Sequence, residues 1–450
     1  MTAPATRIPA GWSNRDLLAE LYRVATAAVD PAPAVAARLE ALEPEARLPG
    51  RRHWVLALGK AAAPMARAAV ETLARWGLEP AGGLVVGPAL HPAPHSAMGA
   101  VPGDHPEPGA GSLAAAEALG ATAARVGGGD EVWVLLSGGA TSLLAAPVEG
   151  VAPAELARLY RLLLGSGLDI AAMNRVRKRF SRWGGGRLAR ALAPARVRVF
   201  VVSDVIGDDL ASIGSGPLVP DPATAGDVRR LLEGAQLWER IPEAARCVVV
   251  ASESGELAET PKPGDEAFAR VTLELIASNR LALEAAARRA AELGLAPVVS
   301  EPPLAGEAST TGASVAATLL QHCGPWKIPQ PARARACLIW GGETTVTLGD
   351  GPPGLGGRCQ ELALAAARVL DGAPTTVALL AAGTDGRDGP TDAAGAIVDG
   401  DTWRAVAAAG RDPARDLAAH DAYRALDAAG ALLRVGLTGT NVMDVVIGVG

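Results

Sequence analysis

The segment from Leu338 to Asp399 constrains the fold of this chain more than any other stretch. Two apolar runs typical of buried strands, Ala336 to Trp340 and Val377 to Ala382, each stop at a glycine turn that carries acidic, hydroxyl or amide side chains. Between them, Gly356-Gly357-Arg358 leads into a helical pattern from Gln360 to Leu370. This order predicts an α/β unit with its polar groups at the carboxyl ends of strands, where open α/β sheets bind ligands. We therefore expect this segment to form one wall of an active site.

Length and composition limit the classes of protein to consider. The chain has 450 residues, of which 49% are apolar, so roughly two or three domains with sizeable cores are expected. Its net charge of −6 gives no electrostatic footprint for nucleic acid, and no basic run with interleaved aromatic residues changes that conclusion. We expect no nucleic-acid partner.

The cysteines and the apolar pattern predict a cytoplasmic chain. The four cysteines form no C-x-x-C pair and no paired spacing with histidines, so neither a zinc site nor a disulfide framework is predicted. The first residues, MTAPATRIPAGWSNRDLL, contain no cationic region followed by an apolar core, and nowhere do about 18 uncharged apolar residues run together. We expect no membrane partner, and a homo-oligomer is compatible with the sequence.

A lysine stands at the first predicted strand-to-helix turn. The apolar run from Trp54 to Leu58 leads into Gly59-Lys60, and helical periodicity follows from Ala61 to Trp76. Free N–H groups and the helix dipole favour an anion at such a turn, which lacks the pattern of a Walker A loop. Lys60 is one of only four lysines, so we expect it to meet a phosphate. The alternative is a surface lysine whose stem covers apolar surface.

A second turn has the composition of an anion site. The predicted strand from Glu131 to Leu136 runs into Ser137-Gly138-Gly139-Ala140-Thr141-Ser142, which offers several backbone N–H groups and three hydroxyls. Such turns bind phosphate or carboxylate groups. The alternative is a tight turn in which glycines allow close backbone packing.

Acidic residues follow the next predicted strand, Val197 to Val202. Ser203-Asp204 and Gly207-Asp208-Asp209 place three carboxylates within six residues of one another. Hard oxygen ligands suit magnesium, so this pattern predicts a divalent-cation site. The alternative is a capped loop with solvated acids.

Two further polar features are each open to a structural and a functional interpretation. The basic stretch from Arg175 to Arg187 is either a solvated helix face or part of an anion-binding cleft. His105 lies in a loop rich in proline and histidine, where a lone histidine is more often a structural hydrogen-bonding group than a catalyst.

Several blocks of sequence, in this order and over about residues 14 to 447, resemble the glycerate 2-kinase family of the MOFRL type, whose members have often been labelled hydroxypyruvate reductases. The blocks are S-G-G-A-T-S at Ser137 to Ser142, M-N-R-V-R-K at Met173 to Lys178, S-D-V-I-G-D-D with G-S-G-P at Ser203 to Pro217, A-S-N-R at Ala277 to Arg280, G-G-E-T-T-V at Gly341 to Val346, G-G-R-C-Q-E-L-A at Gly356 to Ala363, G-T-D-G at Gly383 to Gly386, and T-G-T-N-V at Thr438 to Val442. The chain departs from the family pattern at Cys359 and Met443, where the family usually has asparagine, and the first change can alter a contact that supports the site.

The resemblance implies an α/β fold of two lobes with the active site in the cleft. An N-terminal Rossmann-like kinase domain would span residues 12–325 and a C-terminal α/β MOFRL domain residues 334–450, with a candidate hinge from Gly324 to Arg335. The implied reaction is the ATP-dependent phosphorylation of D-glycerate to 2-phosphoglycerate, with Mg²⁺ as the metal.

The resemblance also implies roles for individual residues. Lys60 and Arg358 would stabilise charge on the transferring phosphoryl group, since phosphoryl transfer depends mostly on positioning and charge neutralisation. Asp204 or Asp385 would hold metal or accept the proton of the glycerate 2-hydroxyl, and both assignments stay open. The residues assigned to the nucleotide are Ser137, Gly138, Gly139, Ala140, Thr141, Asn279 and Glu343, and those assigned to the metal are Asp204, Asp208 and Asp385.

Two other function classes compete with the kinase. The hypothesis of an NAD(P)H-dependent hydroxypyruvate reductase is weakened because the G-x-G-x-x-G string from Gly349 to Gly354 contains two prolines and does not open a helix directly, so the dinucleotide-binding fingerprint is missing. A ligand-binding protein without activity is disfavoured because charged glycine turns recur at so many strand ends.

Overall fold

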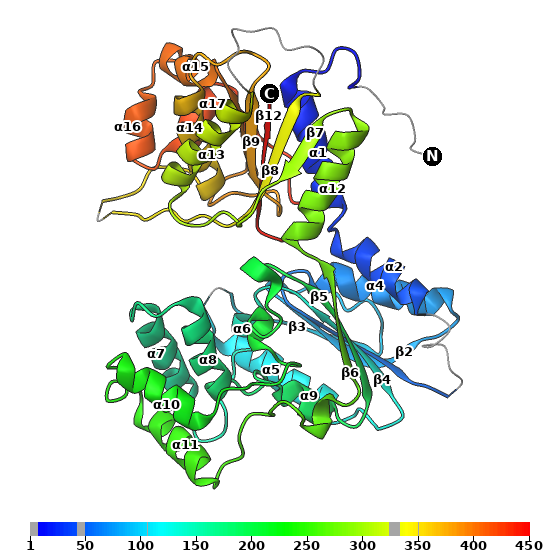
Figure 1. Cartoon of the computed structure of the whole chain (residues 1–450). Helices are drawn as coiled ribbons and strands as arrows, with labels where there is room; N and C mark the ends of the chain where they lie inside the picture. Colours follow the sequence, from blue (N-terminus) through cyan, green and yellow to red (C-terminus); the bar gives the residue numbers. More distant parts are fainter. Residues whose placement is uncertain (1–7, 43–49, 106, 324–333, 350) are drawn as a thin grey trace. The chain divides into compact units, whose positions relative to one another are not determined.

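The structure is a computed structural model that describes residues 8–42, 50–105, 107–323, 334–349 and 351–450. It consists of two compact units. We call Pro31–Ile276 the N-terminal unit, and Met1–Asp30 together with Ala277–Gly450 the C-terminal unit. Each unit is built on one six-stranded sheet (Figure 1).

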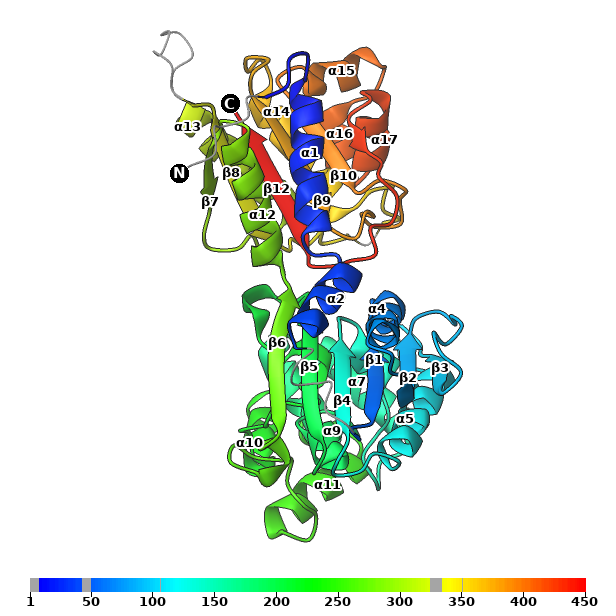
Figure 2. The same ribbon diagram turned by 90° about the vertical axis from the view of Figure 1, so that its right-hand side faces the viewer.

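The sheet of the N-terminal unit has the strand order β3-β2-β1-β4-β5-β6 (Figure 2). Its strands are β1 (His53–Leu58), β2 (Pro80–Gly87), β3 (Met98–Pro102), β4 (Glu131–Leu136), β5 (Arg196–Val202) and β6 (Val271–Ala277). The neighbours from β3 through β5 pair in parallel. Both β1 and β4 are buried along their whole length, which agrees with continuous apolar runs covered on both faces.

Helices cover both faces of this sheet. They are α2 (Pro31–Ala41), α4 (Ala62–Arg75), α5 (Ala110–Ala123), the short α6 (Ala140–Leu143) and α9 (Arg187–Leu192). Trp54, Leu56 and Leu58 of β1 share one apolar core with residues of α5 and α9. Because side chains alternate along a strand, the β1 residues that lie between these three point to the opposite face of the sheet, where α4 packs on β1 and β2.

Four more helices form a separate layer of the N-terminal unit, with an apolar core of their own (Figure 1). They are α7 (Pro153–Leu164), α8 (Ile170–Phe180), α10 (Ala225–Gly234) and α11 (Glu243–Ser254). Leu159 and Leu163 of α7 contribute to that core together with Val176 of α8.

The sheet of the C-terminal unit is mixed, in the order β11-β10-β9-β12-β8-β7. Its strands are β7 (Ala296–Val299), β8 (Ala336–Gly342), β9 (Ala378–Gly383), β10 (Gly395–Asp399), β11 (Leu432–Leu433) and β12 (Asp444–Val449). The last strand, β12, lies between β8 and β9 and is antiparallel to both. The two strands predicted around the Leu338 to Asp399 segment, β8 and β9, are therefore parallel to each other but not adjacent.

Helices lie on both faces of this mixed sheet as well. On one face are α1 (Asn14–Ala27) and α12 (Asn279–Glu292), which pack on each other (Figure 2). On the other face are α13 (Ala308–Cys323), α14 (Arg358–Leu370), α15 (Thr402–Ala408), α16 (Pro413–Ala418) and α17 (Ala422–Ala428). Within the described part of the chain, no helix has both the length and the apolar character needed to cross a membrane.

The compact units divide the chain at other positions than the predicted domains, 12–325 and 334–450. Helix α1 packs on α12, β9 and β12, and β7 pairs with β8, so both flanks of the predicted first domain belong to the C-terminal unit. The physical reason is that α1, α12 and β7 complete that sheet and cover one of its faces. The predicted hinge from Gly324 to Arg335 lies almost entirely outside the described residues, and the strands on either side of it share a sheet.

Candidate active site

Three of the predicted polar turns lie side by side in the N-terminal unit. In the parallel sheet, Leu58 at the end of β1 lies opposite Leu136 at the end of β4, and Leu136 lies opposite Val201 of β5. The residues that follow these strand ends therefore emerge at one edge of the sheet. This edge brings Lys60, the turn that starts at Ser137, and Asp204 together.

Hydrogen bonds tie the first two turns to each other. The N–H of Lys60 donates to the carbonyl oxygen of Gly138 at 2.9 Å, and the N–H of Ala61 donates to Oγ of Ser137 at 3.0 Å. Gly59 has a φ of 127°, and a Cβ at this residue would lie 2.3 Å from Oγ of Ser137. Glycine is thus required there, and the backbone at Lys60 is held by the neighbouring turn.

The glycine turn combines close packing with free backbone donors. A Cβ on Gly138 would lie 1.7 Å from Oδ2 of Asp204, and Gly139 has a φ of 82°. Within the described residues, the N–H groups of Gly138 and Gly139 donate to no protein acceptor. Thr141 Oγ1 lies 3.0 Å from Oγ of Ser215. The close-packing interpretation therefore describes this turn, and the free N–H groups are compatible with an anion site, which stays a prediction.

Lys60, His105 and Asp204 form one electrostatic cluster. Burial raises the pKa of Asp204, and the positive charge of Lys60 opposes that shift. Burial and the same lysine lower the pKa of His105. The imidazole also packs against the glycine turn, since its Cδ2 lies 3.1 Å from the position of a Cβ on Gly139. His105, a weak signal in the sequence, thus lies among the predicted site residues.

The predicted three-carboxylate metal site is not formed by Asp204, Asp208 and Asp209. Across the described ranges, no group of three or more His, Cys, Asp or Glu side chains is arranged to hold a metal ion. Asp209 instead accepts hydrogen bonds from the N–H of Ala211 at 3.0 Å and from Oγ of Ser212 at 2.6 Å. The capped-loop alternative therefore describes Asp209.

In the C-terminal unit, Arg358 is held by two carboxylates. It is the first residue of α14, and its Nε and Nη2 donate to the two carboxylate oxygens of Asp444 at 2.6 and 2.9 Å. Its Nη1 lies 2.7 Å from Oε1 of Glu343. About a third of the Arg358 side chain is exposed, whereas that of Asp444 is buried. A bidentate pair of this kind fixes the plane of the guanidinium.

Asp444 owes its place to strand pairing. It is the first residue of β12 and lies in register with Gly342, the last residue of β8, and with Gly383, the last residue of β9. The Asn279 amide also holds the adjoining backbone, because its Nδ2 donates to the carbonyl oxygens of Val442 and Asp444 at 2.8 and 2.9 Å. The structure therefore gives Asn279, predicted to bind the nucleotide, a supporting contact behind Asp444.

Asp388 supports the start of α14 from inside the protein. Its carboxylate accepts hydrogen bonds from the N–H groups of Cys359 at 3.2 Å and Gln360 at 2.8 Å. Burial raises its pKa to about 7, although those hydrogen bonds favour the charged form. A Cβ on Gly357 would lie 2.3 Å from Cγ of Asp388, which explains the glycine before Arg358.

Asp385 lies at the same edge of the C-terminal sheet. Its Oδ1 accepts a hydrogen bond from the N–H of Arg387 at 3.0 Å. A Cβ on Gly383 would have Oδ1 of Asp385 at 3.1 Å and Oδ1 of Asp444 at 3.6 Å, so the two carboxylates flank this glycine. The hydroxyl of Tyr22 on α1 donates to the Gly383 carbonyl oxygen at 2.7 Å. The turn after β9 is thus held by a hydrogen bond of its own and by Tyr22 of α1.

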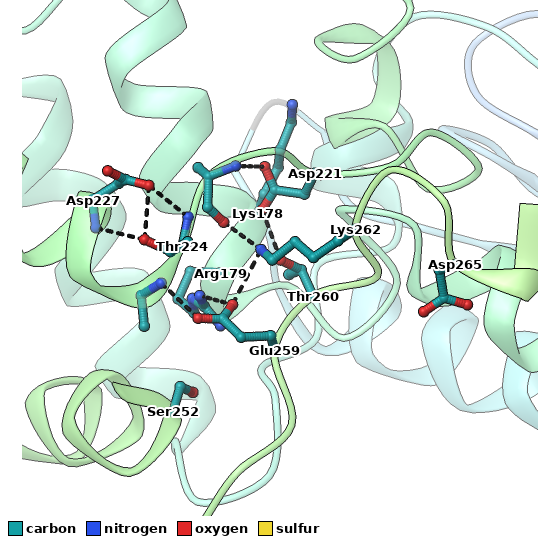
Figure 3. A network of polar contacts seen from close by, with 12 residues as sticks. Lys178, Arg179, Asp221, Thr224, Asp227, Ser252, Glu259, Thr260, Lys262 and Asp265 are labelled. Atoms are coloured by element: carbon teal, nitrogen blue, oxygen red, sulfur yellow. Dashed lines mark hydrogen bonds and ion pairs between the residues drawn. The ribbon is translucent and has the colours of Figure 1, made fainter. Parts of the chain in front are cut away.

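The basic stretch is largely a structural element (Figure 3). Arg179 is buried and pairs with Glu259, and Arg187 donates to the carbonyl oxygens of Lys178 at 2.7 Å and Ser181 at 3.0 Å. Burial lowers the pKa of Lys178, which is nearly inaccessible to solvent. These residues join α8 to the segment that follows α11, so a solvated face does not describe them, and the anion-binding cleft stays a prediction for the rest of the stretch.

The predicted site residues therefore fall into two groups, one in each unit. The N-terminal unit gathers Lys60, the Ser137 to Thr141 turn and Asp204, while the C-terminal unit gathers Arg358, Glu343, Asp385 and Asn279. Asp388 and Asp444 were not predicted as site residues from the sequence. Both acids stand in or beside the glycine-rich blocks at strand ends, and that position was the available signal.

Comparison with known proteins gives a consistent relationship over nearly the whole chain. A family model described as a domain of unknown function, DUF4147, matches residues 17–249, and the MOFRL family model matches residues 336–444. A glycerate 2-kinase from Pyrococcus horikoshii is 38% identical over 399 residues, which cover 88% of this chain and 87% of that protein.

Two further relatives extend the comparison. A protein from Agrobacterium vitis that bears hydroxypyruvate reductase only as a provisional name is 39% identical over 433 residues, covering 96% of this chain and 94% of that protein. The crystal structure of a glycerate kinase from Thermotoga maritima is 36% identical, with a TM-score of 0.84, and the match covers 97% of this chain and 99% of that one. The chain therefore belongs to the glycerate 2-kinase family of the MOFRL type, as its sequence blocks predicted.

Proposed function

We propose that this protein transfers the γ-phosphoryl group of ATP to the 2-hydroxyl group of D-glycerate, giving 2-phosphoglycerate and ADP. The observation that carries the proposal is the cluster of Lys60, Asp204 and the glycine turn at one sheet edge. It supplies a cation, a carboxylate and free backbone donors, which are the groups that phosphoryl transfer requires. We infer the substrate, glycerate, from the relatives that are named as glycerate kinases.

The position of the cluster supports a nucleotide site. In the order β3-β2-β1-β4-β5-β6, the chain adds β2 and β3 on one side of β1 and β4 to β6 on the other, so the topology switches between the adjacent strands β1 and β4. Lys60 and Ser137 follow these two strands. Open α/β sheets bind ligands outside the carboxyl ends of the strands at such a point, as in Rossmann-like folds. The residues proposed for the phosphates are Lys60 and the turn from Ser137 to Thr141.

Arg358 is proposed to neutralise charge on the same phosphoryl group or on the carboxylate of glycerate. Its guanidinium is already oriented by Asp444 and Glu343, so little conformational freedom is lost when an anion binds. Asp204 or Asp385 is proposed to accept the proton of the 2-hydroxyl group.

The donor set is compatible with Mg²⁺. This ion usually takes one or two carboxylates together with substrate phosphates and water, so a three-carboxylate cluster is not required. Asp204 has a half-buried carboxylate beside the proposed phosphate turn and would hold the ion, which would neutralise charge on the phosphates. Asp208 and Asp385 are the other proposed ligands.

The experiment that tests the function is identification of the product. Purified protein is incubated with ATP, Mg²⁺ and D-glycerate, and the product is analysed by mass spectrometry and by enzymes that distinguish 2-phosphoglycerate from 3-phosphoglycerate. Formation of 2-phosphoglycerate is expected. Oxidation of NADH that depends on hydroxypyruvate, without phosphorylation of glycerate, would replace the kinase by the reductase.

A further inference from the structure

A pocket in the N-terminal unit adjoins the proposed phosphate turn. It has a volume of about 270 Å³ and is lined by Gly139, Thr141 and Ser142 on the side of the turn. Its other walls come from α7 and α8, which belong to the separate helical layer of this unit. This volume approaches the lower end of the range for pockets that hold drug-sized ligands, about 300 Å³. The pocket is thus larger than a single phosphate group requires.

One wall of the pocket carries a buried hydroxyl group without a partner. Tyr160 of α7 is only 8% exposed, and its hydroxyl oxygen has no hydrogen-bond partner among the described residues. A buried polar group without a partner costs roughly 1–3 kcal/mol, so such groups are rare in native structures and point to a missing partner. A ligand in this pocket can supply that partner.

The remaining walls combine apolar surface with charge. Ala157 and Leu164 of α7 line the pocket with the ring of Tyr160, and the guanidinium of Arg177 lies 5.3 Å from the centre of that ring. Nε of Arg177 is also buried without a partner in the described part of the chain. Glu107 is a further lining residue.

This combination discriminates between classes of ligand. A carboxylate at Glu107 would repel a bare phosphate group but would accept hydrogen bonds from sugar hydroxyls. Arginine planes and apolar walls accommodate a heteroaromatic base, whose ring nitrogens and amino group can pair with a buried hydroxyl. A three-carbon acid would leave most of the apolar surface uncovered.

We propose that this pocket binds the adenosine portion of the nucleotide, with Tyr160 and Arg177 contacting the base and Glu107 the ribose. The inference rests on the proposed kinase function, because it continues from the turn that would hold the phosphates. It also gives a role to Arg177, a member of the basic stretch that lines this pocket.

The test measures nucleotide binding directly, by isothermal titration calorimetry on the full-length protein with ADP and, separately, with inorganic tripolyphosphate. Ala157→Trp places a large side chain in the pocket, and Tyr160→Phe removes only the hydroxyl group. Ala154→Trp is the matched control, because Ala154 lies on the same helix but is exposed and does not line the pocket. Tyr423→Phe controls for loss of a tyrosine hydroxyl elsewhere.

The expected result is a loss of ADP affinity of tenfold or more in Ala157→Trp and of about threefold to tenfold in Tyr160→Phe, the latter being the range for one hydrogen bond. Tripolyphosphate affinity should stay within about twofold of the original protein in both variants, and both controls should bind ADP normally. Unchanged ADP affinity in Ala157→Trp, or equal losses for ADP and tripolyphosphate, would overturn the proposal.

Kinetics separate this inference from the proposed function. If 2-phosphoglycerate forms and Ala157→Trp raises the KM for D-glycerate but not for ATP, the pocket belongs to the acceptor and the adenosine assignment is wrong. If ADP binds through this pocket but no phosphoglycerate forms, the kinase proposal fails and the pocket assignment stands.

Discussion

Asp444→Asn should release Arg358 without removing any side-chain volume. Asparagine keeps one oxygen acceptor, so the change removes about one of the two charge-assisted hydrogen bonds, each of which contributes about 1.5–3 kcal/mol. Because a third of the Arg358 side chain is exposed, solvent can replace part of that interaction. We expect the free energy of unfolding to fall by about 1–2 kcal/mol.

The effect on turnover should exceed the effect on stability. A guanidinium displaced by about 1 Å is expected to lower the rate by about 10²-fold, whereas Arg358→Ala, which removes the cation, should cost about 10²–10³-fold. If Asp444 acts only by positioning Arg358, the double variant should turn over at the rate of Arg358→Ala alone. Steady-state kinetics and chemical denaturation of the three variants measure both quantities.

A matched control comes from a second arginine and aspartate pair in the same unit. Nε of Arg411 lies 2.6 Å from a carboxylate oxygen of Asp416, which is also largely buried and lies outside the proposed site. Asp416→Asn should therefore lower stability and leave turnover unchanged. Normal turnover in Asp444→Asn despite its loss of stability would refute the positioning role, and a double variant slower than Arg358→Ala would show that Asp444 acts independently.

Four further predictions concern Lys60, the glycine turn, Asp388 and the metal. Lys60→Ala should lower turnover by about 10²–10³-fold with little change in melting temperature, because the side chain is exposed; normal kinetics would make it a surface lysine. Gly138→Ala should displace Asp204, whose carboxylate occupies the space for a Cβ, and should lower turnover, whereas Gly129→Ala, which has open space, should not. The pKa of Asp388 is raised to about 7 from an ordinary 3.8, so its contribution to the stability of the fold is complete below about pH 4 and falls progressively as the pH rises to 7. Asp388→Asn should remove this part of the pH dependence of the free energy of unfolding, measured by denaturation from about pH 4.5 to 7. The same pH dependence in the variant and the original protein would contradict this prediction. Exhaustive EDTA treatment should abolish phosphorylation until Mg²⁺ is restored, so full activity in EDTA would exclude the metal.

Local sequence was a good guide to the strands and to the turns that end them. The runs that became β1, β4, β5, β8 and β9 are mostly apolar and stop at glycine or at serine, so burial and a turn signal coincide in the sequence itself. Turn chemistry of this kind depends on a few neighbouring residues. It placed Lys60, Ser137, Asp204 and Arg358 correctly at strand or helix ends.

What the tertiary structure decided is which of these ends meet. The sequence by itself determined the family, the α/β character and the polar turns, since these depend on composition, periodicity and ordered blocks of residues. It did not show that β12 enters the sheet between β8 and β9 and brings Asp444 to Arg358, 86 residues earlier in the chain. Nor did it show that α1 and α12 belong with the C-terminal unit. Such pairings depend on which sheet edge and which apolar face remain to be covered once the rest has folded, and no local stretch of sequence contains that information.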